Sequence, residues 1–265
     1  MASQKKHVGL ALGIGLILAA VRSMIVYNLM EVNAYEKKTY YLPDCFSVNI
    51  FSTVCVALLL VFVLLAIKEG KGKGFVPENK CNAASPASCI LAFMLLGAVV
   101  IYVFSLVEKD MDPTFLGMGI LLFSVASAVW FLINGLRVVQ NKTAAVMALM
   151  PVFLMIFRLL GDFLRTNATP LASSGGYHIM GLVAALIYFL CEGKNFAIGG
   201  SAAIYLCSGY LSIVLLLVYA LPNVILHCFG VFSFDYYAGY SAVDFCIAIY
   251  IWARMINIKF VGADE

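Results

Sequence analysis

The chain has 265 residues, of which 63% are hydrophobic and only 12% are charged, and its mean hydropathy is +0.99. Soluble globular domains carry about a quarter charged residues, so this composition excludes a soluble fold and indicates a protein that lies in a lipid bilayer. The net charge of +3 is that of a membrane protein with basic cytoplasmic loops, and no nucleic acid is expected as a partner.

Eight apolar runs follow one another along the chain, and a bilayer is crossed by about 20 apolar residues. The runs cover residues 8–30, 47–67, 87–107, 113–136, 143–164, 176–191, 196–221 and 237–256, the sixth beginning near residue 172. The first run is too long for a signal peptide, contains Arg22 and is followed by further spans, so we interpret it as a retained helix. The pattern predicts an all-α integral membrane protein: a bundle of eight transmembrane helices forming one polytopic domain over residues 1–265.

Prolines and glycines separate most of these runs and also interrupt one of them. The glycine and lysine run at 70–74 and the pair Leu221-Pro222 are typical of connections between spans. Pro151 lies in the middle of the fifth run, where its ring predicts a kink that frees the carbonyl of Met147.

Basic residues are distributed unequally between alternate connections. Eleven fall on one side: Lys5, Lys6, Lys68, Lys71, Lys73, Lys80, Arg137, Lys142, Lys194, Arg254 and Lys259. Four fall on the other: Lys37, Lys38, Lys109 and Arg165. Because cytoplasmic loops keep the basic residues, we expect a multi-pass protein of the cell membrane with both termini in the cytoplasm.

Aromatic residues near the ends of the runs are typical of interfacial belts. The outer set is Tyr35, Tyr40, Tyr41, Tyr177, Tyr236, Tyr237 and Tyr240, and the inner set is Trp130 and Trp252. Such residues anchor helices at the boundary between lipid and water.

The two halves of the chain, 8–136 and 143–257, share a faint similarity. The second run ends in Glu69-Gly70-Lys71 and the sixth is followed by Glu192-Gly193-Lys194. Arg22 in the first run corresponds to Arg158 in the fifth. This suggests two parallel four-helix repeats, as in some transporters, although the loop lengths differ between the halves.

Ionisable residues inside the spans are the candidates for function, because a charge in hydrocarbon is costly unless it faces protein or water. Helical rise places Arg22 roughly 13 Å and Arg158 roughly 10 Å below the outer boundary. The outer half of the bundle collects six polar residues on several helices: Arg22, Arg158, Asp162, Asp244, Asn49 and His178. We expect them to share one level in the membrane.

The favoured hypothesis is an outward-facing polar chamber that binds or transports a small polar or anionic solute. Two arginines offer bidentate contacts to a carboxylate or phosphate, and two aspartates balance them or take a cation or proton. A competing reading is a non-transporting membrane subunit, assembly partner or sensor, in which Arg158–Asp162 and Arg22–Asp244 are ion pairs that only fix packing.

Catalysis and metal binding find little support in the sequence. Serines 173 and 174 precede His178, which suggests an intramembrane enzyme acting on a lipid-like substrate, but a loop before a helix explains them equally. We expect no enzyme activity, no cofactor and no metal. The expected partners are the lipid bilayer, the small solute, and a second copy or another membrane subunit, because glycine faces such as Gly9 and Gly13 favour close helix packing.

Overall fold

A computed structural model of the chain describes residues 2–32, 39–41, 46–75, 84–108, 114–136, 142–168, 175–197, 200–229, 236–256 and 260–262. Within these residues, eight helices are long and apolar enough to cross a membrane. The expected helical, multi-pass membrane bundle is therefore confirmed.

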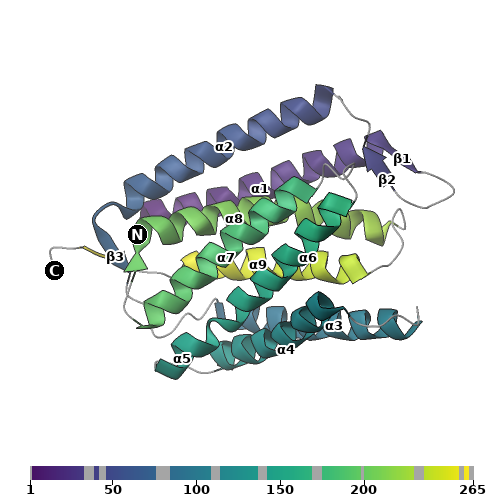
Figure 1. Ribbon diagram of the computed structural model, residues 1–265. Helices are drawn as coiled ribbons and strands as arrows, with labels where there is room; N and C mark the ends of the chain where they lie inside the picture. Colours follow the sequence, from purple (N-terminus) through teal and green to yellow (C-terminus); the bar gives the residue numbers. More distant parts are fainter. Residues whose placement is uncertain are drawn as a thin grey trace.

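The helices follow the chain in order, and one span is divided in two (Figure 1). They are α1 (Ala2–Leu29), α2 (Phe46–Gly70), α3 (Ala84–Glu108), α4 (Phe115–Leu136), α5 (Lys142–Met147), α6 (Met150–Ala168), α7 (Gly175–Ala197), α8 (Ala202–Cys228) and α9 (Tyr236–Ile256). Helices suit these apolar runs because every backbone hydrogen bond is then made within the segment, away from lipid.

Helix α8 lies at the centre of the bundle and packs against α1, α2, α7 and α9. Its buried side chains lie on all sides of the helix, which is the pattern of a helix enclosed by others. By contrast, α2 buries a single stripe, from Phe51 through Cys55, Leu59 and Phe62 to Ala66. Helices α3 and α4 pack on each other and reach the bundle through α9 and α6, at the opposite side from α2 in Figure 1.

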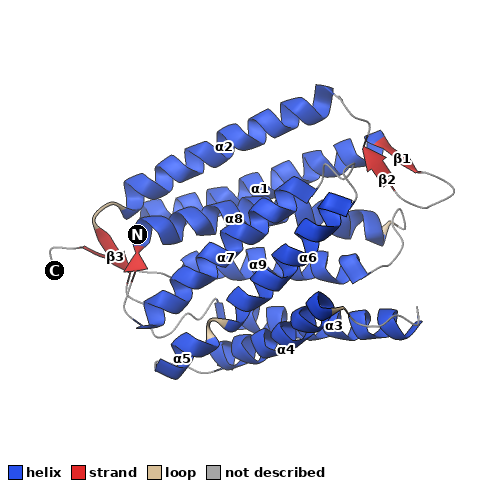
Figure 2. Cartoon of the chain, in the orientation of Figure 1, coloured by secondary structure: helices blue, strands red, loops and turns tan. Residues whose placement is uncertain are grey.

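Short strands lie at both ends of the bundle (Figure 2). Strands β1 (Met30–Val32) and β2 (Thr39–Tyr41) pair antiparallel after α1, and we call this the hairpin end. At the other end, which we call the sheet end, β3 (Lys73–Phe75) pairs with β4 (Gly200–Ser201) and β5 (Phe260–Gly262). The glycine and lysine run at 70–74 thus ends α2, turns through Gly72 at φ +70° and enters this sheet.

The first and last helices meet at the sheet end. The side-chain amide of Gln4 in α1 donates a hydrogen bond to the carbonyl of Met255 in α9, at 3.1 Å. Figure 1 accordingly shows both chain ends on this side of the bundle. A chain with an even number of spans has both ends on the same side of the membrane. From the distribution of basic residues, we propose that the sheet end faces the cytoplasm.

The fifth span is broken where the proline predicts a kink. Helix α5 stops at Met147, a turn covers Ala148 and Leu149, and α6 begins at Met150, directly before Pro151. The amide of Leu149 bonds the carbonyl of Val146 at 3.1 Å, which is a tighter turn than an α-helix.

The predicted bounds of the sixth and seventh spans are wrong. The sixth span does not end at residue 191, because α7 continues to Ala197, and the seventh does not end at residue 221, because α8 continues through Pro222 to Cys228. A proline inside a membrane helix is tolerated where other groups satisfy the carbonyl it frees, and Arg22 does so here. The two-repeat arrangement stays a prediction; it pairs central α8 with peripheral α3.

Gly70 tests the packing of α2 against α8. A β-carbon at Gly70 would lie 2.3 Å from the backbone nitrogen and Cα of Ala203, whereas one at Gly97 in α3 meets nothing within 4 Å. We expect Gly70→Ala to destabilise the protein by about 1–3 kcal/mol, because backbone atoms must move. Gly97→Ala is the control and leaves stability equal or higher. Thermal unfolding in detergent measures both, and equal melting temperatures would contradict this packing.

Candidate functional site

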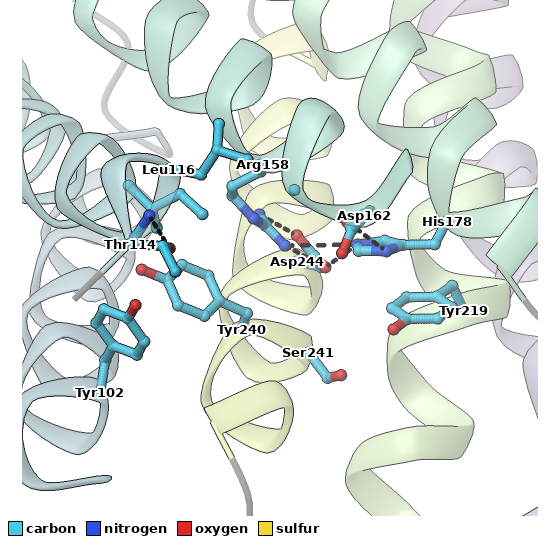
Figure 3. A pocket seen from close by; sticks show the side chains of 13 residues that line it. Tyr102, Thr114, Leu116, Arg158, Asp162, His178, Tyr219, Tyr240, Ser241 and Asp244 are labelled. Atoms are coloured by element: carbon cyan, nitrogen blue, oxygen red, sulfur yellow. Dashed lines mark hydrogen bonds and ion pairs between the residues drawn. The ribbon is translucent and has the colours of Figure 1, made fainter. Parts of the chain in front are cut away.

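A cavity of about 250 Å³ lies at the hairpin end, between α3, α4, α6, α7, α8 and α9 (Figure 3). Four of the six expected site residues line it: Arg158, Asp162, His178 and Asp244. The remaining lining residues are Tyr102, Thr114, Leu116, Gly117, Ile120, Gly161, Tyr219, Tyr240 and Ser241. Several helices therefore bring ionised groups and hydroxyls to one small volume.

Arg158 and Asp244 form a bidentate ion pair between α6 and α9. Nη1 of the arginine donates to Oδ1 of the aspartate at 2.6 Å, and Nη2 donates to Oδ2 at 2.8 Å. The side chains are 4% and 0% exposed. The guanidinium carbon also lies 4.9 Å from the centre of the Tyr240 ring. Fork geometry of this kind is the strongest way to hold a carboxylate in a buried place.

His178 of α7 joins this pair to the second aspartate. Its Nε2 lies 2.9 Å from Oδ2 of Asp244, and its Nδ1 lies 3.0 Å from Oδ2 of Asp162. The imidazole stacks on the ring of Tyr219, with centroids 3.9 Å apart. Figure 3 shows the resulting row of side chains, from Arg158 through Asp244 and His178 to Asp162. The row spans three helices and ends at Asp162, which is 22% exposed.

The two expected ion pairs, Arg158–Asp162 and Arg22–Asp244, are wrong, because the charged residues pair differently in the structure. Asp244 binds Arg158 rather than Arg22, and Asp162 contacts His178. A spacing of four residues along a helix favours the pair Arg158–Asp162. The fully buried carboxylate of Asp244 on the neighbouring helix makes two bonds to the arginine instead, because leaving a fully buried charge without a partner is strongly destabilising.

Arg22 does not line the cavity, and it faces α8 instead. Its Nη1 donates to the carbonyl of Val218 at 2.8 Å, and its guanidinium carbon lies 4.9 Å from the centre of the Tyr177 ring. Pro222, four residues after Val218, has no N–H for that carbonyl. Tyr177 and His178 are neighbours in α7, so the start of this helix separates Arg22 from the cavity.

Asn49 of α2 is also apart from the cavity. Its side chain is exposed on the outside of the bundle, and its backbone carbonyl accepts a bond from the hydroxyl of Thr53 at 2.9 Å. Depth alone placed Asn49 with the others, but depth does not say which side of a helix faces the protein.

The tyrosines around the cavity were not expected there. Tyr240 was assigned to an outer belt, yet it is 5% exposed, and its hydroxyl lies 3.1 Å from that of Ser124. Tyr219 and Tyr102 line the cavity from α8 and α3. The available signal was spacing: Tyr240 precedes Asp244 by four residues, on the same face of α9.

A second polar network lies toward the sheet end, outside the six expected site residues. Glu192 of α7 accepts a bond from Nε of Arg254 at 2.8 Å and another from the hydroxyl of Tyr250 at 3.1 Å. Asn134 donates to the same hydroxyl at 3.2 Å. Glu192 and Arg254 were assigned to connections because charges were taken to mark helix ends; they are buried within α7 and α9.

The contacts described above do not suggest which residues would hold a metal ion or a cofactor. Over the described part of the chain, no group of three or more His, Cys, Asp or Glu side chains is placed to hold a metal ion. The cavity residues bond one another, and their hydroxyls and carboxylates suit hydrogen bonding to a small polar molecule.

The buried pair Glu192–Arg254 gives a test of the second network. Replacing Glu192 alone by Leu leaves a buried guanidinium without its acid, so we expect a loss of about 3–5 kcal/mol in stability. The double variant Glu192→Leu/Arg254→Met removes both charges and regains most of that loss. Unfolding in detergent measures the cycle. Losses that simply add would mean that the two groups do not interact.

Comparisons with protein-family models, with curated proteins and with solved structures found no match to this chain. Its membership in the class of multi-pass helical membrane proteins therefore rests on its own spans. A more specific function is therefore inferred from the residues that line the cavity.

Proposed function

We propose that this protein binds a small polar solute in the cavity at the hairpin end and moves it across the membrane. The observation that carries the proposal is the row Arg158–Asp244–His178–Asp162, whose four members line the cavity and of which Asp162 is the most exposed. Ionisable groups at this depth are costly, and in membrane proteins they usually mark the path of a solute, ion or proton.

The geometry favours a neutral or cationic solute over an anionic one. Arg158 is occupied by Asp244, and Arg22 lies outside the cavity. The other polar groups that line the cavity include the carboxylate of Asp162 and the hydroxyls of Tyr102, Tyr219, Thr114 and Ser241. A carboxylate beside aromatic rings suits an amine, and hydroxyls suit a polyol or other hydrogen-bonding molecule.

His178 supports a link between solute and proton. Two carboxylates bond its two ring nitrogens, and both bonds at once require the imidazolium, since a neutral ring donates through one nitrogen only. A neutral ring still has partners, because Nδ1 donates to Asp162 while Nε2 faces Nη2 of Arg158 at 3.4 Å. Both protonation states thus have a hydrogen-bond arrangement in the same place.

A packing role is the second candidate function, and one observation favours it. Asp244 is 0% exposed and fully bonded by Arg158 and His178, as expected of a network that only orients α6, α7 and α9. On this reading the protein is a structural subunit or assembly partner, and the cavity has no solute of its own. Asp162 separates the two readings because it lies at the cavity wall.

The solute site is tested by thermal unfolding of the purified protein with a panel of amines, amino acids and polyols. We expect one class to raise the melting temperature of the parent, and Asp162→Asn to weaken that binding about tenfold, as for the loss of one charged contact. Asn49→Ala is the control, because Asn49 is exposed on α2. Uptake of the same solute into proteoliposomes tests transport.

Two results would contradict this site. One is equal stabilisation of the parent and Asp162→Asn by the same solute. The other is a parent that responds to no member of the panel, which would favour the packing role instead.

The proton link predicts a dependence on pH for a cationic solute. With the imidazolium, the four groups Arg158, His178, Asp162 and Asp244 sum to zero charge; with neutral His178 they sum to minus one. Binding of an amine should therefore strengthen as pH rises through the titration of His178, with release of a proton. His178→Gln should abolish this dependence. A pH profile that is unchanged in the variant would exclude His178 as the coupling group.

A further inference from the structure

Arg22 forms a second polar site, on the other side of α7 from the cavity. We propose that it binds an anion, a phosphate or carboxylate group, between α1, α2, α7 and α8. This site stands apart from the solute cavity of the proposed function, and neither one requires the other.

The charge of Arg22 has no counterpart in the described part of the chain. The side chain is 6% exposed, and its two contacts are the neutral carbonyl of Val218 and the neutral ring of Tyr177. The other buried arginines, Arg158 and Arg254, each have a carboxylate within 2.8 Å. A buried cation without an anion is strongly destabilising, so a buried arginine of this kind calls for an acidic partner.

The hydrogen bond to the carbonyl of Val218 does not by itself explain why a charged residue occupies position 22. Pro222 frees that carbonyl, and a neutral donor such as glutamine would satisfy it at lower cost. Of the five N–H groups of the guanidinium, the structure accounts for one. The planar fork that remains is the group proteins use for bidentate binding of phosphates and carboxylates.

The surroundings of Arg22 are polar enough to take such an anion. The hydroxyls of Tyr177 and Ser52 lie 2.7 Å apart, beside the ring on which the guanidinium rests. On the outer face of α1, neighbouring Val21, Met24 and Tyr27 are large apolar side chains exposed on the surface of the bundle, where a membrane helix meets lipid. The phosphate can therefore belong to a lipid headgroup or to a free solute, since both present the same oxygens.

Two titrations of the purified protein distinguish these sources. In neutral detergent, sodium phosphate is compared with sodium chloride at equal ionic strength. In nanodiscs, an anionic phosphatidylglycerol bilayer is compared with phosphatidylcholine. We expect one of these anions to raise the melting temperature of the parent, and Arg22→Gln to weaken the effect about tenfold or more, because the glutamine keeps a donor for Val218 but has no charge. Asp162→Asn is the control and keeps the full response to the anion.

Three outcomes would overturn the proposal. The first is a parent that responds to neither anion, a result that needs no variant to fold. The second is an equal response in Arg22→Gln. The third is an internal partner: residues 28–45 contain Glu31, Glu36 and Asp44. If neutralising these three destabilises the parent but not Arg22→Gln, one of them is the counterion and no external anion is needed.

Discussion

The carboxylate of Asp244 is the group on which the hairpin end of the bundle depends. It is fully buried in α9, and it is tolerable there only because Arg158 from α6 and His178 from α7 both bond it. Three helices are thereby fixed in rotation and depth around one side chain. These three helices form part of the cavity wall, so the bonds that stabilise this region also hold the polar groups of the site in place.

Polar contacts also join α7 to α9 at the other end. Helices α7 and α9 each pack along α8 through apolar side chains, whereas the bonds between them are polar. Near the hairpin end α7 supplies the base and α9 the acid, and near the sheet end α7 supplies the acid Glu192 and α9 the base Arg254. In a transporter whose two ends open in turn, apolar packing on α8 would persist while these polar contacts exchange. In the arrangement seen here, Glu192 and Arg254 form a closed ion pair.

Hydropathy predicted the eight spans, because the length and apolar composition of a span follow from the thickness of the bilayer. It did not predict which side chains meet. Helices that are apolar nearly all round give no sign of their rotation, so Asn49 and Arg22 were grouped with the cavity by depth alone. Glu192 and Arg254 were misplaced for another reason. Each charge was taken to mark the end of a helix, whereas a charged side chain that has a buried partner of opposite charge is tolerated within a membrane helix. The two partners are 62 residues apart in the sequence, so the pattern of residues along either helix does not reveal that they pair.

The charged residues of the outer half form two separate groups, although their total charge is zero. Two arginines and two aspartates in the outer half sum to zero, which suggested one neutral chamber. The structure separates them: both aspartates lie with Arg158 on one side of α7, and Arg22 lies on the other, where no carboxylate of the described residues bonds it. With His178 neutral, the four cavity groups sum to minus one, whereas the described contacts of Arg22 are to neutral groups and leave its positive charge unbalanced. The two proposed sites therefore differ in the sign of their charge, so we expect the cavity to prefer a cation or proton and the Arg22 site to prefer an anion.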